Sequence, residues 1–150
     1  MKLKSSFTAI LFIGCGLLFA TGCLQQKKGN TDKDVPQAVR QVILQKYPGA
    51  TITDYDKDAA GAEIDIRDRG VKKEILLGAN NEWISTKQDI RAENVPAVVM
   101  DNLTNSAYHE YNIEEVSQVE RASGTYYVFE LKQNNNEVKL AFNSDGQLIQ

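Results

Sequence analysis

The pattern in this chain that comes closest to a metal site is a set of alternating aspartates, Asp54, Asp56 and Asp58, with Asp65 at the twelfth position counted from Asp54. Calcium takes several carboxylate oxygens from a tight loop, and an EF-hand loop begins in this way. However, Ala59 stands where that loop needs glycine, and the flanking residues have strand patterns instead of helical ones. Because every second side chain of a strand lies on one face, we expect these acids to form a solvated face and predict no metal site.

The only histidine, His109, is the best candidate for a general base. A Ser-His-Asp arrangement would require a nucleophilic serine beside it, and the sequence contains no Gly-x-Ser-x-Gly elbow. One histidine, with no cysteine after Cys23, also excludes a conventional zinc site. We therefore expect His109 to lie after a helix, near the negative end of its dipole, without a catalytic role.

Pairs of acids are the remaining candidates for hydrolytic chemistry. Glu114-Glu115, or Asp65 with Asp68, could imitate the two carboxylates of a glycosidase. Adjacent residues of a strand point to opposite faces, so Glu114 and Glu115 are predicted not to share a site. No glycine-rich phosphate loop follows a predicted strand. The sequence therefore predicts no enzyme and no cofactor.

The first residues have the layout of a secretion signal. Lys2 and Lys4 precede an apolar run over residues 7–20, which is the order of a signal peptide. A membrane-spanning helix needs about 20 apolar residues, and this run is shorter and contains two glycines. We predict a signal peptide over residues 1–22.

A cysteine ends this segment in a context that could accept a lipid. The residues Ala20-Thr21-Gly22-Cys23 resemble a bacterial lipobox, with Ala20 where leucine is usual. Small residues let the chain lie extended in a processing site, and the thiol of Cys23 is the nucleophile for acylation. Cys15, inside the apolar run, is the rival acceptor, and ordinary signal cleavage that leaves Cys23 as a free thiol is the other alternative.

The charge of the processed chain bears on its partners. The sequence holds 17 basic and 20 acidic residues, and removing Lys2 and Lys4 leaves 15 against 20, a net of −5. An acidic chain without a basic run is a poor binder of nucleic acid, so membrane contact is predicted through lipid alone. Residues 23–34 are expected to be a lipidated cysteine and a polar tether. With both cysteines at or before residue 23, no disulfide can form within residues 35–150.

Residues 35–150 are predicted to fold as α+β, in two tandem α-β4 repeats packed as one domain. Helical spacing of apolar residues from Val35 to Tyr47, ended by Pro48-Gly49, predicts a helix. Alternating apolar residues then predict an antiparallel meander of four strands, over residues 50–57, 62–67, 71–77 and 82–86.

The same pattern recurs in the second half of the chain, which sets repeat one at 35–90 and repeat two at 91–150. Val95-Pro96 repeats Val35-Pro36 at an offset of 60. Apolar strand residues recur at an offset of 65, so that Tyr127, Phe129 and Leu131 correspond to Ala62, Ile64 and Ile66. The predicted core under the two helices comprises Ile64, Ile66, Phe129, Leu131 and Phe142.

These motifs resemble a known family. The second repeat carries Val95-Pro96, Ile113-Glu114-Glu115-Val116, Tyr127-Val128-Phe129-Glu130-Leu131 and Leu140-Ala141-Phe142-Asn143-Ser144-Asp145-Gly146-Gln147-Leu148. This set is similar to the PepSY-like, β-lactamase-inhibitor-protein-like domains of bacterial envelope lipoproteins. The first repeat matches less well, with Ala79-Asn80-Asn81 in place of Ser144-Asp145-Gly146. The resemblance implies a domain that binds or restrains proteins, often peptidases, and it carries over no contact residue.

Strand alternation selects one candidate binding residue. If Tyr127, Phe129 and Leu131 face the core, then Tyr126, Val128 and Glu130 face the other way. An exposed tyrosine is a common anchor of protein interfaces, so Tyr126 is predicted to bind. The rival is that the sheet of repeat two packs on that of repeat one and hides Tyr126. Trp83, which corresponds to Leu148, is expected in the core.

The sequence thus predicts a non-catalytic, lipid-anchored binding protein of the cell envelope, on its periplasmic or surface side. The expected partner is an unknown envelope protein or peptide. A structural accessory subunit of an envelope assembly is the alternative, and an enzyme is the third hypothesis.

Overall fold

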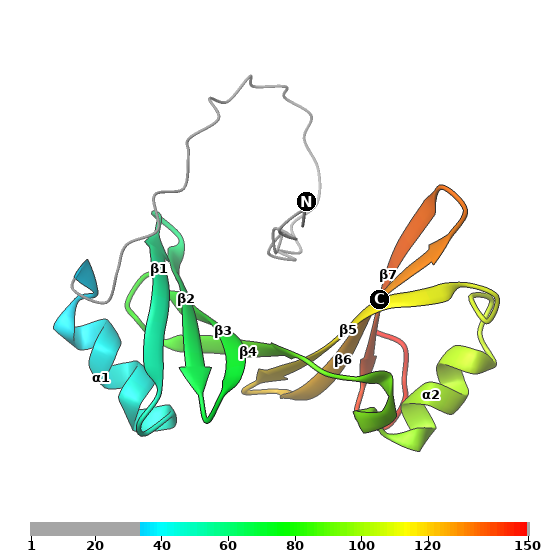
Figure 1. Ribbon diagram of the computed structural model, residues 1–150, viewed down its shortest axis with the longest axis horizontal. Helices are drawn as coiled ribbons and strands as arrows, with labels where there is room; N and C mark the ends of the chain where they lie inside the picture. Colours follow the sequence, from blue (N-terminus) through cyan, green and yellow to red (C-terminus); the bar gives the residue numbers. More distant parts are fainter. Residues whose placement is uncertain (1–33, 150) are drawn as a thin grey trace.

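Seven antiparallel strands form one continuous sheet in the computed structural model, which describes residues 34–149 (Figure 1). The strands follow one another in chain order, so that β1 and β7 are the two edges. The elements are α1 (Gln37–Lys46), β1 (Thr51–Lys57), β2 (Gly61–Asp68), β3 (Val71–Gly78), β4 (Trp83–Asp89), the short 3₁₀ helix η2 (Ala92–Asn94), α2 (Ala97–Thr104), β5 (Asn112–Arg121), β6 (Gly124–Gln133) and β7 (Asn136–Asn143).

The helix α1 begins directly after Pro36, whose ring fixes φ at −56° and whose missing N–H needs no partner at a helix start. Val39 and Ile43, four residues apart, are buried against the sheet. The helix closes where Tyr47 N donates to Ile43 O at 2.8 Å. Gly49 then takes φ +85°, a conformation that favours glycine and turns the chain into β1.

The helix α2 repeats this construction on the other half of the sheet. It begins directly after Pro96, and Val99 and Leu103 are its buried residues. It lies between β4 and β5 in the chain, so each helix precedes the strands that it covers (Figure 1).

Two hairpins turn in the gaps between the predicted strands, at residues 68–70 and 78–81. Arg69 and Gly70 both have positive φ, +48° and +85°, which is the two-residue turn that suits the twist of paired strands. Asn81, with φ +63°, lies in the predicted turn before β4. These turns fix the register of β2, β3 and β4.

Two separate hydrophobic clusters form the core, one under each helix. The predicted core residues Ile64, Ile66, Phe129, Leu131 and Phe142 are all buried, which confirms that part of the prediction. The cluster under α1 contains Val35, Val39, Ile43, Tyr47, Ile52, Tyr55, Ala62, Ile64, Ile66, Ile75 and Leu77. The cluster under α2 contains Val95, Val99, Leu103, Val116, Tyr127, Phe129, Leu131, Leu140 and Phe142.

The α+β class is confirmed, but the count of four strands in each repeat is not. Four strands follow α1, whereas three follow α2. Where the eighth strand was expected, Leu148 forms only an isolated bridge with Phe142. Asn143 holds the preceding turn by accepting hydrogen bonds from Asp145 N and Gln147 N, so only Leu148 and Ile149 continue along β7. The duplication and its boundaries at 35–90 and 91–150 stay predictions.

The sheet is bent near the junction of β4 and β5, and both helices lie on the outer side of the bend (Figure 1). The opposite side is concave and carries neither α1 nor α2; we call it the helix-free face. The two halves therefore join edge to edge through β4 and β5 and do not stack. The rival expectation, in which one sheet covers the other and hides Tyr126, is wrong. No helix within residues 34–149 is long and apolar enough to cross a membrane.

Candidate interaction surface on the helix-free face

Cross-strand pairing places one row of side chains across the whole helix-free face. The row runs through β1 to β7, with each residue opposite the next, and consists of Asp54, Asp65, Glu74, Lys87, Val119, Tyr126 and Asn143. It is acidic at the β1 end and apolar or neutral from β5 onward. The face therefore offers two chemically different halves to a partner.

Val119, the fifth residue of this row, is only 2% exposed, although neither α1 nor α2 lies over it. Its cross-strand neighbours are Lys87 and Tyr126. Ser85 and Ser117, on the same face of neighbouring strands, are also buried. Because the sheet bends toward this face, side chains of adjacent strands converge and cover its floor. Sequence alternation did not identify Val119 as a buried residue. The only hint in the sequence is that it is aliphatic and stands among polar neighbours.

Lys87 is the hub of a polar network at the junction of the two halves. Its Nζ lies 3.2 Å from Glu115 Oε1 and 3.8 Å from Asp89 Oδ1. The Ser117 hydroxyl lies within hydrogen-bonding distance of both carboxylates. Burial opposes the charge of Lys87, but its hydrogen bond to Glu115 and the charges of Glu115, Asp89 and Glu74 outweigh that effect and raise its pKa. The network therefore remains charged while it ties β4 to β5.

The β1 end of the face concentrates carboxylates. Asp54, Asp56, Glu63, Asp65 and Glu74 lie there together by strand register. Burial, followed by the charge of Glu63, raises the pKa of Glu74. Lys72 forms a 2.8 Å ion pair with Asp65, and the charges of Lys87 and Lys72 both oppose the rise in the pKa of Glu74. This half of the face is suited to basic groups of a partner.

Tyr126 lies on the helix-free face as predicted, while Tyr127 is buried in the cluster under α2. The Tyr126 hydroxyl donates to Ser123 Oγ at 2.8 Å, and the Arg121 guanidinium lies 5.6 Å from the Tyr126 ring centroid. The ring is only partly exposed, and its contacts with Ser123 and Arg121 orient it. It is therefore an oriented aromatic surface next to the apolar Val119 and Val128.

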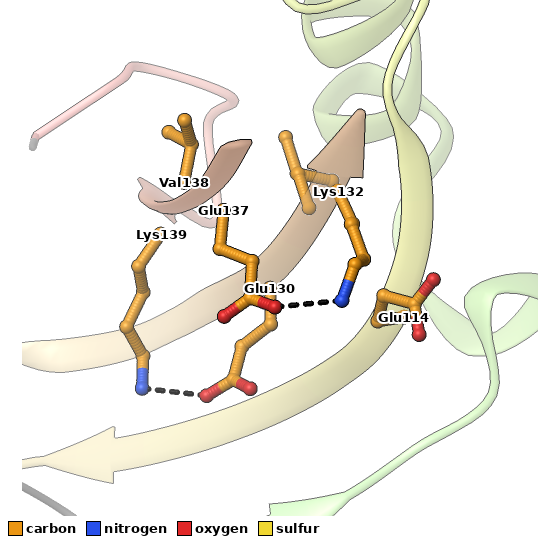
Figure 2. A pocket seen from close by; sticks show the side chains of 7 residues that line it. Glu114, Glu130, Lys132, Glu137, Val138 and Lys139 are labelled. Atoms are coloured by element: carbon orange, nitrogen blue, oxygen red, sulfur yellow. Dashed lines mark hydrogen bonds and ion pairs between the residues drawn. The ribbon is translucent and has the colours of Figure 1, made fainter. Parts of the chain in front are cut away.

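A shallow pocket of about 380 Å³ lies beside the β6–β7 hairpin (Figure 2). Its walls are ion pairs: Lys132 Nζ lies 2.7 Å from Glu137 Oε1, and Lys139 Nζ lies 2.7 Å from Glu130 Oε1. Glu114, Leu131 and Val138 complete the lining. Each lysine is already opposite a glutamate, and Glu114 adds a third carboxylate, so the lining carries one formal negative charge and does not favour an anion.

A second, smaller pocket of about 170 Å³ lies on the helix side, between the two core clusters. Tyr47 and Trp83 both donate hydrogen bonds to the Thr86 hydroxyl there. Lys46 of α1 lies 3.8 Å from the Trp83 ring centroid and 2.9 Å from Glu120 of β5. These polar contacts thus fill the space between the two core clusters and connect them, and we assign this pocket a structural role.

The structure separates the aspartates that resembled a calcium loop. Asp54 and Asp56 lie on the helix-free face of β1, whereas Asp58 lies in the following turn and accepts hydrogen bonds from Ala60 N and Gly61 N. Asp65 pairs with Lys72 on β3. Among residues 34–149, no group of three His, Cys, Asp or Glu side chains could hold a metal ion.

His109 lies in the exposed turn after α2. Its Nδ1 lies 3.1 Å from the carbonyl oxygen of Ser106, not from the hydroxyl, and its Nε2 lies 3.9 Å from Glu110. The Ser106 hydroxyl donates instead to Leu103 O. The structure therefore does not bring His109 and the Ser106 hydroxyl together as a base and nucleophile.

The two acid pairs, Asp65 with Asp68 and Glu114 with Glu115, are also separated. For Glu114 and Glu115 the reason differs from the one expected. Asp65 lies on the helix-free face, whereas Asp68 is buried on the helix side beside Lys73. The argument that Glu114 and Glu115 point to opposite faces of a regular strand was wrong, because a β-bulge interrupts β5 at this point. The bulge places Glu114 at the pocket of Figure 2, while Glu115 pairs with Lys87.

Trp83 lies at the margin of the cluster under α1 and is half-buried. Its indole N–H donates to Thr86 at 3.0 Å. The expectation that Trp83 packs in the core is thus confirmed only in part. Cys15, Cys23, the signal peptide and the tether as far as residue 33 lie outside the described residues.

The comparisons with known proteins agree with this architecture. A family described as "Putative beta-lactamase-inhibitor-like, PepSY-like" matches residues 24–77 and 72–150. The chain belongs to this PepSY-like family. The resemblance found in the sequence is therefore confirmed. No curated protein matches the chain.

Several solved structures share the fold. A BLIP-like protein from Bacteroides fragilis is 25% identical, with a TM-score of 0.69, and the match covers 77% of this PepSY-like chain and 83% of that one. A protein from Bacteroides eggerthii, described as among "putative periplasmic proteins", has a TM-score of 0.69 at 19% identity, covering 77% and 86%. A DUF2874 family protein from Bacteroides uniformis has a TM-score of 0.70 at 18% identity, covering 77% and 87%.

Proposed function

We propose that this PepSY-like chain is a non-catalytic binding protein of the cell envelope that holds a protein or peptide on its helix-free face. The observation that carries the proposal is the position of Tyr126 on this concave face, beside the apolar Val119 and Val128. A tyrosine held by its neighbours offers a broad contact area and a hydroxyl, and it loses little rotamer freedom on binding. Aromatic anchors of this kind carry much of the energy of protein interfaces.

The charge of the face supports a partner with a convex and partly basic surface. The carboxylates gathered on β1, β2 and β3 exceed the cations around them, with Lys72 paired to Asp65. Opposite charge on the partner would speed association and set its orientation. The partly exposed Tyr126 and Val128 would then supply most of the binding energy, while the buried Val119 supports the Tyr126 ring from the neighbouring strand.

The family description points to the class of partner. The family is described as β-lactamase-inhibitor-like, and a structural neighbour is described as BLIP-like. We infer that the partner of this chain is an envelope hydrolase, such as a peptidase, whose activity is restrained when the helix-free face covers it. The role is one of binding and occlusion, and no side chain of this face needs to react.

Anchoring by lipid at Cys23 would place the domain beside such a partner. The tether of residues 24–34 is polar and lets the domain reach away from the membrane. Stable anchoring takes two or more acyl chains, since one gives marginal attachment. Cys23→Ser should release the protein from membranes or leave its signal uncleaved, whereas Cys15→Ser should change neither. An unmodified Cys23 in the intact mass of the membrane form would contradict lipid anchoring.

The function itself is tested by capture of partners from detergent-solubilised envelopes of the native cells, with the full chain as bait. A single stoichiometric hydrolase whose activity falls on binding is the expected result. A large stable complex would assign the chain instead to an envelope assembly, as a structural accessory subunit. Turnover that is lost in the His109→Ala variant would contradict the non-catalytic role.

A further inference from the structure

The strand β7 forms an edge of the sheet, and part of that edge is open. Among residues 34–149, no strand lies beyond β7. Its last residues are covered, because Ile149 N donates to Ala141 O at 2.8 Å and Asn143 N donates to Gln147 O at 3.0 Å. Its first residues, 136–140, belong to the β6–β7 hairpin, which projects from the body of the sheet (Figure 1). Such an edge is a template for another strand.

The two covered residues show which main-chain groups of β7 face outward. Ala141 and Asn143 direct their backbone groups to the outer edge, where Ile149 and Gln147 meet them. This direction alternates along a strand, and the pairing of β7 with β6 is regular over its whole length. The backbone groups of Glu137 and Lys139 therefore also point to the outer edge.

The order of side chains at this edge is self-complementary. Glu137 and Lys139 flank Val138, and both charged side chains lie on the helix-free face (Figure 2). We propose that β7 pairs antiparallel with β7 of a second copy of the chain, with the two-fold axis at Val138. Glu137 of each copy then lies opposite Lys139 of the other, in a pair that exchanges both backbone hydrogen bonds. The interface is isologous, as in a two-fold dimer.

Existing ion pairs are extended in this arrangement instead of being broken. Within one copy, Glu137 already pairs with Lys132, and Lys139 with Glu130, each at 2.7 Å. Across the dimer, the row of Lys132 and Glu137 from one copy continues into Lys139 and Glu130 of the second. Charges therefore alternate over four adjacent strands, which favours this register electrostatically.

Other registers and the other edge of the sheet are less favourable. An axis at Glu137 or at Lys139 places like charges opposite each other. An axis nearer Phe142 meets the edge already occupied by Ile149 and Gln147. On β1, an axis at Tyr55 sets Asp54 opposite Asp56, and a bulge interrupts that strand. The complementary charges of β7 thus select a second copy as its occupant, independently of what binds the helix-free face.

The test measures the dissociation constant of the purified full chain by sedimentation equilibrium, at concentrations up to about 1 mM, where even weak association is populated. The wild type should dimerise. Glu137→Lys and Lys139→Glu should each raise the dissociation constant at least about tenfold, because two attractive cross-strand pairs become repulsive. An equimolar mixture of the two variants should dimerise again, since each introduced charge meets its opposite. Asp65→Lys, on an interior strand, is the control and should dimerise like the wild type, and circular dichroism checks that each variant is folded.

The register has its own test, in chains whose Cys15 and Cys23 are changed to serine. Val138→Cys should give a disulfide-linked dimer on mild oxidation, since two such residues at the axis have Cα atoms about 4.5 Å apart. Asn136→Cys should not, because its two copies are about 14 Å apart, at four residue steps of about 3.4 Å along the strands. A wild type that stays monomeric, a variant mixture that does not recover, or equal cross-linking of both cysteine variants would overturn the proposal.

Discussion

Lys87 on β4 and Glu115 on β5 join the two halves of the sheet, with Nζ and Oε1 3.2 Å apart. Both side chains lie on the concave, helix-free face, and that of Lys87 is only 12% exposed. The pair is close to Val119 and to the Ser117 hydroxyl, which binds the same carboxylate. The strand junction is therefore held by a sheltered polar network, whereas the two apolar clusters lie to either side of it.

Loss of the Lys87 ammonium should weaken this junction. Lys87→Met leaves Glu115 half-buried without its main cation, and we expect a cost of about 1–3 kcal/mol in the free energy of unfolding by urea. Lys72→Met is the matched control, because Lys72 pairs with Asp65 but is 63% exposed, and it should cost less than about 1 kcal/mol. Equal effects of the two variants would contradict the sheltered character of the junction.

The same variant should change the pH dependence of stability. Burial opposes ionisation of Glu115, but hydrogen bonds from Lys87 and Ser117 and the charge of Lys87 outweigh it and lower its pKa from the usual 4.5. A lowered pKa in the folded state contributes stability above the unfolded pKa, and that contribution is lost as the pH falls through the folded value. Urea melts between pH 6 and pH 3, roughly the range of carboxyl titration, should therefore show a smaller acid-induced loss for Lys87→Met than for the wild type. An unchanged slope would contradict the assignment.

Glu74 should behave in the opposite way. Burial first, and then the charge of Glu63, raise its pKa above the usual 4.5. Its contribution is thus most favourable below 4.5 and is lost as the pH rises through its folded pKa. Glu74→Gln should stabilise the protein at pH 7 by about 0.2–1 kcal/mol, the scale of one cross-strand charge repulsion, with little gain at pH 4. A loss of stability at pH 7 would show that Glu74 makes a net favourable contact.

Phe129 tests the assignment of faces in β6. It is fully buried and packs edge to face on Phe142, with ring centroids 5.8 Å apart. Phe129→Ala should cost about 3–5 kcal/mol in a denaturant melt, as for other buried phenylalanines. Val128→Ala, on the other face, should cost roughly 1 kcal/mol or less. Similar costs for the two neighbours would be incompatible with the strand register.

Gly146 tests how the last turn docks on α2. It has φ +80°, and a Cβ there would lie 2.9 Å from Val98 O and would also collide with the Asn102 amide. Gly70 has φ +85° with nothing within 4 Å of such a Cβ. Gly70→Ala should therefore cost about 1 kcal/mol for backbone strain alone, and Gly146→Ala about 1–3 kcal/mol more. If thermal melts show equal shifts, the turn does not pack on α2 as described.

The sequence predicted much of the fold, because the periods of its apolar residues are regular. The alternation around Phe129 identified the core face of β6, and Val-Pro steps marked the starts of both helices. It failed where the backbone departs from regularity. The bulge beside Glu114 interrupts the alternation of side chains between the two faces of β5. The turn held by Asn143 leaves Leu148 in a single bridge instead of a strand.

The candidate surface was only partly predictable, since it depends on tertiary geometry. Tyr126 was assigned to the correct face from alternation alone. The burial of Val119 and the network around Lys87 depend on how β4 meets β5 and on the bend of the sheet. Neither relationship is encoded in a local spacing, because Lys87 and Glu115 are 28 residues apart.

The most direct test of the central claim measures partner capture and stability together for Tyr126→Ala. If the helix-free face binds, affinity for the captured envelope partner should fall by about 2 kcal/mol or more, while the melting curve stays nearly unchanged. Leu44→Ala, on the exposed surface of α1, should leave both unchanged. Undiminished affinity in Tyr126→Ala, or a large loss of stability with the partner still captured, would contradict the account and leave the binding face elsewhere.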